Sequence, residues 1–419
     1  MALELELFLR QYPRKKMIYA TCISLFIGLI CSKFLLTLSM IALAVFGFLS
    51  PTLGQDWKRI WTNKSFVATL GIFMLFLVSA LLSDNYSASM VRIRIALPML
   101  LLPIAFALLP IFSKKSYQQL LSIYFYMMVV ACFGVLINYG LNYEAMQQRL
   151  IVSKAIPTPN GEHIRFSLMI NLAIFAGFWL LEQQFYWKKT LEKCLMRILV
   201  LFLMITLHLL SVRIGILVLY GGLGTTVFYY MLRKKHYVMG VFLLMGIAVM
   251  PYLAYKYVPS VQTKVNLTKH NWDMYQQGHI GEYSDTRRLL SYKIAWDVVQ
   301  QAPWFGVGIG DLNDEQAKHY QKKYPDQQVM YPHNFFLMLY AATGILGLSF
   351  FLGCFFFPLF YHQNYKNLFF LLFYTTIFLS FMTENTILSA IGVGIYSFFL
   401  LFSVNYLEGV YKEEKVLKN

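Results

Sequence analysis

Long apolar runs recur along almost the whole chain and constrain its fold more than any other feature. About twelve of them come close to the roughly 20 residues that cross a bilayer as a helix. Backbone polar groups in lipid must be hydrogen-bonded within their own segment, so runs of this kind form helices. We therefore predict an all-α, polytopic integral membrane protein. The predicted spans are residues 17–32, 34–50, 65–83, 93–112, 118–140, 163–182, 194–211, 213–232, 237–257, 334–361, 366–382 and 386–407.

The composition excludes the other broad classes. A soluble domain carries roughly 25% charged residues, whereas this chain has 13%, with 58% hydrophobic residues. An aromatic content of 17% also excludes a disordered chain. The five cysteines lie in or beside apolar runs and form no CxxC pair, so we predict neither disulfides nor a cysteine metal site.

The distribution of lysine and arginine predicts the orientation in the membrane. With the N-terminus in the cytoplasm, the short segments on that side hold most of these residues, as in the run 233–235. Both termini are therefore predicted to be cytoplasmic. This topology accounts for most of the net charge of +16, so no nucleic-acid partner is needed to explain it.

The same topology divides the chain into three parts. Residues 1–257 form a bundle of about nine helices, and residues 333–419 add about three more with a short cytoplasmic tail. Between them, residues 258–332 form one large external loop. Within this loop, residues 286–301 have the pattern of an amphipathic helix, and the glycines in 306–310 predict a flexible turn.

Arg213 is an external cation that topology does not explain. It lies between two apolar runs with almost no loop, where an arginine near lipid costs a few kcal/mol or more unless its side chain reaches the headgroups. One interpretation is such a snorkelling arginine. We favour the other, in which Arg213 faces a cavity and binds an anion.

Further candidates lie in and around the large loop. Arg287 and Arg288 start its helix, and because successive residues point about 100° apart, at most one easily faces the bilayer. We expect Arg287 to lie on a solvated face and Arg288 to face the site. Pro332 is predicted to start the tenth helix, which places His333 in its first turn. An imidazole there can accept a proton near neutral pH.

Weaker candidates begin other helices on the same side. His163 and Arg165 lie at the start of the sixth predicted span, whereas Arg92 and Arg94 equally suit anchors to lipid headgroups. Guanidinium groups bind phosphate oxygens in pairs, so two or more of them suit a lipid-linked diphosphate. The acidic residues of the large loop are scattered, so we predict chemistry without a metal or another cofactor.

At these residues the chain resembles the superfamily of O-antigen ligases and O-antigen polymerases, which are polytopic glycosyltransferases. The likeness is best over about residues 200–350. Three features carry it: Ser211-x-Arg213 at a helix start, Arg288 followed by Trp296, Pro303 and the glycine run 306–310, and His333-Asn334 followed by Gly344 and Gly347. By distance to Pro303, Tyr292 matches the family's aromatic residue more closely than Trp296, which favours Arg288 over Arg287.

The resemblance implies a transferase at the periplasmic face of the bacterial inner membrane. Its donor would be a glycan carried on undecaprenyl diphosphate, and its acceptor lipid A–core or another lipid-linked glycan. Arg213 and Arg288 would hold the diphosphate, and His333 would activate the acceptor hydroxyl. We assign Arg165, His163, Asn334 and Arg287 to substrate binding.

Two other functions stay open at this stage. A repeat-unit polymerase of O-antigen or exopolysaccharide differs from a ligase only in its acceptor. A flippase or transporter also suits about twelve helices, but transporters place charges near the membrane midplane. Here the unexplained cations lie at the external helix ends, so we favour the ligase.

Overall fold

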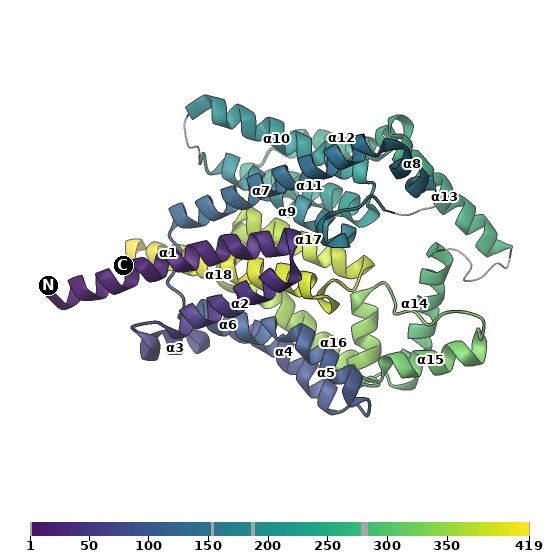
Figure 1. Ribbon diagram of the computed structural model, residues 1–419, viewed down its shortest axis with the longest axis horizontal. Coiled ribbons are helices and arrows are strands. Elements are labelled where there is room, and N and C mark those ends of the chain that lie inside the picture. Colours follow the sequence, from purple (N-terminus) through teal and green to yellow (C-terminus); the bar gives the residue numbers. More distant parts are fainter. Residues whose placement is uncertain (1, 152–154, 186–188, 278–283, 419) are drawn as a thin grey trace.

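The computed structural model describes residues 2–151, 155–185, 189–277 and 284–418. Every regular element in this part of the chain is a helix, as the apolar runs predict (Figure 1). Both termini lie at one end of the molecule, the terminal end. The helices of residues 259–323 lie at the opposite end, the loop end.

The helices follow the predicted order with several interruptions. In the first half they are α1 (Ala2–Cys31), α2 (Lys33–Phe48), α3 (Leu53–Thr62), α4 (Lys64–Leu81), α5 (Tyr86–Ala96), α6 (Pro98–Leu108), α7 (Lys114–Leu141), α8 (Tyr143–Ile151), η1 (Pro159–Gly161), α9 (His163–Glu182) and α10 (Lys189–Leu210). In the second half they are α11 (Arg213–Lys234), α12 (Tyr237–Tyr257), α13 (Pro259–Gln276), α14 (Ser284–Gln301), α15 (Leu312–Lys323), α16 (Phe335–Phe360), η2 (Tyr361–Lys366), α17 (Leu368–Thr383), η3 (Thr386–Leu388) and α18 (Ala390–Lys418).

The structure supports part of the predicted number of membrane spans. Nine helices among the described residues are long and apolar enough to cross a membrane, or ten if α2 and α3, bent by 115°, form one span. The helix α17 is apolar but shorter, with 16 residues. A multi-pass helical protein is thus confirmed, whereas the count of about twelve is not.

A hairpin with a single connecting residue forms the start of the bundle. Ser32 separates α1 from α2, and its hydroxyl accepts a hydrogen bond from the Leu35 backbone N–H at 3.3 Å, which caps α2. The two helices pack so closely that a Cβ atom on Gly28 would lie 2.4 Å from the nitrogen of Leu36. The first two predicted spans are therefore two antiparallel helices in direct contact.

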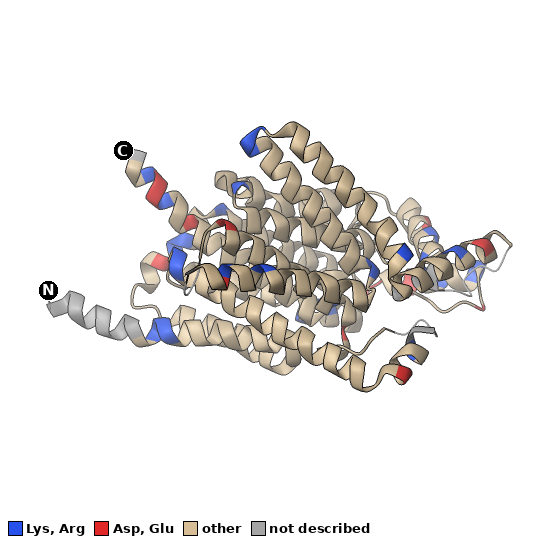
Figure 2. Ribbon diagram, turned by 90° about the horizontal axis from the view of Figure 1, so that it is seen from above, with Lys and Arg blue, Asp and Glu red and all other residues tan. Residues whose placement is uncertain are grey.

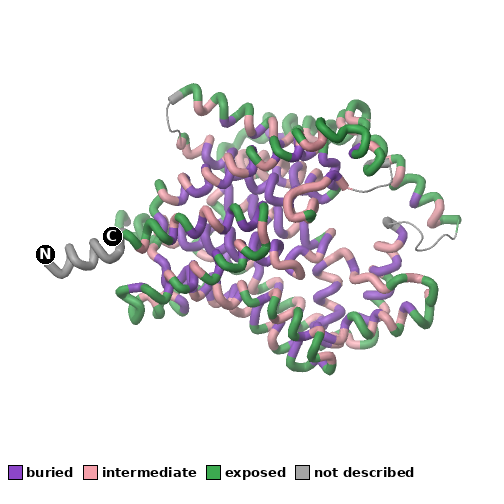
Figure 3. Tube along the Cα trace, viewed as in Figure 1, coloured by how far each residue is buried: buried purple, intermediate pink, exposed green. Residues whose placement is uncertain are grey.

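Burial and charge separate along the bundle as expected for a membrane protein. The middle of the molecule is nearly free of charged residues, which gather toward its two ends (Figure 2). The helices α9 and α18 are mostly buried, whereas α12 is almost entirely exposed (Figure 3). An apolar helix with so little buried surface needs an apolar surrounding, which lipid supplies.

The helix α16 is broken near its start, and the loop end is attached at the break. Gly344 has φ +67°, a conformation that side-chain-bearing residues rarely adopt. The Val307 N–H donates to the Ala341 carbonyl at 3.0 Å, and the Ile345 N–H donates to the Pro303 carbonyl at 2.9 Å. Backbone from the large loop thus replaces hydrogen bonds that the interrupted helix would have made for itself.

The glycine run 306–310 is fixed in place, so the prediction of a flexible turn is wrong. The Ile309 N–H donates to the Ser79 hydroxyl on α4 at 3.0 Å. The Asp311 carboxylate then accepts the Asn85 N–H, at the start of α5, at 2.7 Å. The glycines allow close approach of backbones here, and those backbones are hydrogen-bonded. The segment therefore anchors the loop end to the bundle.

Candidate active site

Arg213 is placed by a two-residue link between α10 and α11. Ser211 has φ +50°, and its hydroxyl donates to the His208 carbonyl at 2.9 Å, which closes the end of α10. Arg213 is the first residue of α11 and is exposed. The predicted position between two apolar helices with almost no loop is thus confirmed.

A cavity of about 870 Å³, the site cavity, opens beside Arg213 at the loop end. Segments far apart in sequence line it: the end of α8, residues 155–161, the starts of α9 and α11, α13, α14 and the end of α17. The charged and imidazole side chains in its lining are those of Arg149, His163, Arg213, Arg288 and Glu384. Its volume falls in the range of ligand sites, roughly 300–1,000 Å³.

Glu384 joins the groups that the sequence singled out. It caps the end of α17, and its side chain is only 8% exposed. The Arg288 guanidinium contacts its carboxylate at 3.2 Å, and Nδ1 of His333 lies 3.3 Å from both carboxylate oxygens. The guanidinium of Arg165 donates to the neighbouring Asn385 carbonyl at 3.4 Å. One buried carboxylate therefore contacts two of the predicted residues, Arg288 and His333, and Arg165 lies beside it.

The charge of this carboxylate is maintained by its partners. Burial alone would raise the pKa of Glu384. The hydrogen bond from His333 and the positive charges of His333, Arg288 and Arg165 outweigh burial, so the pKa lies below its usual value. A buried but ionised carboxylate holds the imidazole and the guanidinium in fixed positions.

His333 is oriented from two sides. The Tyr292 hydroxyl on α14 donates to the His333 carbonyl at 2.8 Å, and Glu384 faces Nδ1. Trp296, by contrast, is half exposed and contacts Tyr340 edge-on. The aromatic residue that contacts the histidine is therefore Tyr292, the one that spacing to the proline favoured.

The start of α16 differs from the prediction. The helix begins at Phe335, and Asn334 is its N-cap, accepting the Leu337 N–H at 3.0 Å. Pro332 is thus not a helical residue, and His333 precedes the cap instead of lying in the first turn. Its backbone is consequently outside the helix, where Tyr292 can bind its carbonyl. The Asn334 side chain makes this capping contact and does not line the site cavity.

The remaining candidates fall into two groups. His163 lines the site cavity, as does Arg288. Arg165 and Arg287 do not line it. Arg165 lies beside it, since its guanidinium donates to the carbonyl of Asn385, the residue after the lining residue Glu384. Arg213, Arg288 and His163 therefore line one cavity, whereas His333 does not line it and is connected to it through Glu384. Arg287 lies outside.

Comparison with known families agrees with this geometry. Residues 198–352 match the family model described as O-antigen ligase. Over this stretch, called the O-antigen ligase domain below, the chain is similar to that family. The match covers less than half of the chain, and it supports the ligase and polymerase type of membrane glycosyltransferase. No curated protein matches the chain.

The O-antigen ligase domain contains Arg213, Arg288 and His333, but not the whole site. Glu384 lies beyond it, and His163 and Arg149 lie before it. Sequence reasoning missed Glu384 because acidic residues were sought only in the large loop. The available signal was a lone carboxylate between two apolar spans, on the same predicted side as Arg213.

Proposed function

We propose that the protein is an O-antigen ligase-like glycosyltransferase. It moves a glycan from undecaprenyl diphosphate to a hydroxyl group of lipid A–core at the periplasmic face of the inner membrane. The observation that carries this proposal is the site cavity, which both Arg213 and Arg288 line and in which Glu384 connects Arg288 to His333. A repeat-unit polymerase remains the alternative, because the same site can serve another lipid-linked acceptor.

The two arginines supply the diphosphate site. A guanidinium has five N–H donors, and the contact of Arg288 with Glu384 involves Nη2 alone. The Arg288 side chain is 36% exposed, so its other donors can reach the site cavity. Arg213 lines the same cavity from the start of α11. Two guanidiniums facing one cavity can bind a diphosphate and stabilise its charge as it leaves.

The histidine and the carboxylate supply the proton acceptor. The acceptor oxygen bonds to the anomeric carbon of the glycan while the bond from that carbon to the diphosphate oxygen breaks. The electron pair leaves with undecaprenyl diphosphate, and the hydroxyl proton passes to Nε2 of His333. Because Nδ1 faces Glu384, Nε2 is the nitrogen that takes the proton, and the carboxylate stabilises the imidazolium.

In this proposal the two arginines, and not a metal ion, stabilise the charge of the leaving diphosphate. Among the described residues, no three or more His, Cys, Asp or Glu side chains gather in a metal-holding arrangement. The arginines can perform the task that a divalent cation performs elsewhere, since both neutralise a leaving diphosphate.

The first test separates transfer from folding. We expect His333→Ala to reduce transfer by about 10²–10⁴-fold, the usual contribution of a general base. The control is His319→Ala, on α15 of the same loop and outside the site cavity. A purified, folded His333→Ala enzyme that transfers at the wild-type rate would remove the base from the proposal.

The second test identifies the acceptor. In a deletion strain, a ligase leaves unmodified lipid A–core and long glycan on undecaprenyl diphosphate. A polymerase instead leaves lipid A–core capped by a single repeat unit. An unchanged lipopolysaccharide pattern would contradict both.

A further inference from the structure

A second cavity, the side cavity, lies next to the site cavity. Its volume is about 390 Å³, and it is enclosed by α13 and the start of α14. Its lining consists of Thr268, Lys269, Asn271, Trp272, Asp273, Thr286 and Leu289. Neither the predicted diphosphate ligands nor the histidine belongs to this set, so the proposed transfer step leaves the side cavity without a role.

The lining has the chemistry of a sugar-binding site. Trp272 is about half exposed, and its ring stacks on Tyr275 with centroids 5.9 Å apart and an interplanar angle of 27°. The face of an aromatic ring is electron-rich, and the C–H face of a pyranose packs on it. The lining surface is mostly apolar, and its few polar groups include the side chains of Asn271 and Asp273, which can bond ring hydroxyls.

The position of the side cavity relates it to the reaction. Asn271 on α13 is buried and lines both cavities, and Thr286 lies two residues before Arg288 on α14. A ligand that extends from a diphosphate in the site cavity past Asn271 therefore reaches Trp272. A lipid tail is the competing occupant, because most of the lining surface is apolar. Equal loss of binding of the bare and the glycan-bearing lipid in Trp272→Ala would assign the side cavity to the tail and refute the glycan subsite.

The geometry points to the side cavity as a glycan subsite, in which a pyranose ring stacks on Trp272 and is hydrogen-bonded by Asn271 and Asp273. This inference rests on the proposed transferase function and adds a group that recognises the sugar. The ring belongs either to the glycan on the donor lipid or to the acceptor glycan. Both sources present the same chemistry, and the experiment distinguishes them.

The experiment measures binding and transfer with the purified full-length protein. One probe is undecaprenyl diphosphate without sugar, and the other is undecaprenyl diphosphate carrying the glycan, extracted from a deletion strain. The variants are Trp272→Ala and Trp272→Phe, which keeps an aromatic face. The control is Trp304→Ala, an exposed tryptophan of the same loop that lines neither cavity.

For a donor subsite, Trp272→Ala weakens binding of the glycan-bearing lipid by about tenfold, the upper range for one aromatic contact. Binding of bare undecaprenyl diphosphate stays unchanged, and Trp272→Phe recovers most of the loss. For an acceptor subsite, both lipids bind as in the wild type, and KM for the acceptor rises by about tenfold. If Trp272→Ala matches Trp304→Ala in every measurement, the subsite is refuted.

Failure of the transferase proposal would look different. Bare undecaprenyl diphosphate has no sugar for the side cavity, so its binding reports on the site cavity alone. If Arg213→Ala and Arg288→Ala bind it as tightly as the wild type, the diphosphate site is wrong whatever Trp272 does.

Discussion

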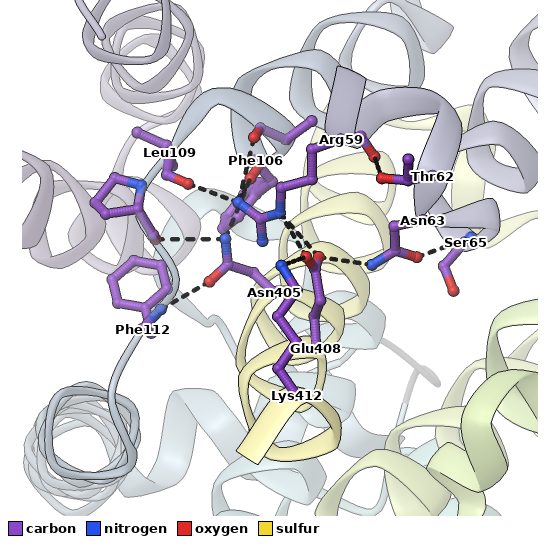
Figure 4. A network of polar contacts seen from close by, with 12 residues as sticks. Arg59, Thr62, Asn63, Ser65, Phe106, Leu109, Phe112, Asn405, Glu408 and Lys412 are labelled. Atoms are coloured by element: carbon purple, nitrogen blue, oxygen red, sulfur yellow. Dashed lines mark hydrogen bonds and ion pairs between the residues drawn. The ribbon is translucent and has the colours of Figure 1, made fainter. Parts of the chain in front are cut away.

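Two arginine–glutamate ion pairs, one at the terminal end and one at the loop end, are used differently. At the terminal end, Nε of Arg59 lies 2.8 Å from the Glu408 carboxylate, with both side chains at most 10% exposed (Figure 4). Nη1 of Arg59 also donates to backbone carbonyls at the end of α6, including that of Leu109 at 2.8 Å. At the loop end, Arg288 contacts Glu384 but is 36% exposed and lines the site cavity.

The two pairs differ in what their remaining hydrogen-bond donors and acceptors face. Glu408 also accepts from the Asn63 amide at 2.8 Å and from Lys412 at 2.7 Å, so its partners all come from the protein. The Arg59 pair therefore ties α3, α4, the end of α6 and α18 together. The Arg288 pair keeps donors that face a cavity. A buried ion pair alone indicates little about function, whereas a pair beside a cavity indicates binding.

The sharpest way to break this comparison is to remove the terminal pair. We expect Arg59→Ala to lower the free energy of unfolding by about 3–5 kcal/mol, because it leaves the Glu408 charge buried and partly uncompensated. Thermal unfolding of the purified protein in detergent measures it, with exposed Lys58→Ala on the same helix as control. A wild-type melting temperature for Arg59→Ala would show that the pair does not hold these helices.

Removing Arg288 at the loop end should reduce transfer strongly and stability only slightly. Arg288→Ala is expected to lower transfer by about 10²–10³-fold, as loss of one charge-stabilising donor does, with a smaller fall in melting temperature than Arg59→Ala. Transfer assays and unfolding on the same preparations measure both, and Arg94→Ala, an exposed arginine outside the site cavity, is the control. Equal destabilisation by both variants would erase the distinction between the pairs.

The loop-end carboxylate should also show a pH-dependent contribution to stability. The pKa of Glu384 is lower in the folded protein than its ordinary value of 4.5. Its stabilising contribution is therefore fully present above that value and is lost as pH falls through the folded-state pKa. We expect Glu384→Gln to melt below the wild type at neutral pH, with the gap closing in acid. A gap that stays constant with pH would contradict a charged Glu384.

The smallest effect is expected at the rim of the terminal pair. Lys412 contacts Glu408 at 2.7 Å but is 58% exposed. An exposed ion pair contributes about 0–1 kcal/mol, so Lys412→Ala should leave both melting temperature and transfer near wild-type values. If Lys412→Ala lowers the melting temperature as much as Arg59→Ala does, the contacts of Glu408 depend on this exposed lysine.

The sequence predicts those features of the structure that depend on short stretches of chain. Apolar length gives the helices, and the two-residue link gives the position of Arg213. The contacts of Glu384 are not local, since it lies 51 residues from His333 and 96 from Arg288, and no periodicity connects them. The start of α16 was misplaced for a different reason: proline suggested a first helical residue, but Asn334 is the stronger N-cap signal.

The attachment of residues 303–308 to the break in α16 has a consequence for product size. The helix that carries Arg288 ends at this attachment, and the helix that follows His333 contains it. The two reactive groups are therefore connected by one hydrogen-bonded backbone frame. Under the proposed function, such a frame recognises the reducing end of a polymer and is indifferent to its length. The distribution of chain lengths on the cell surface would then be decided before the glycan arrives.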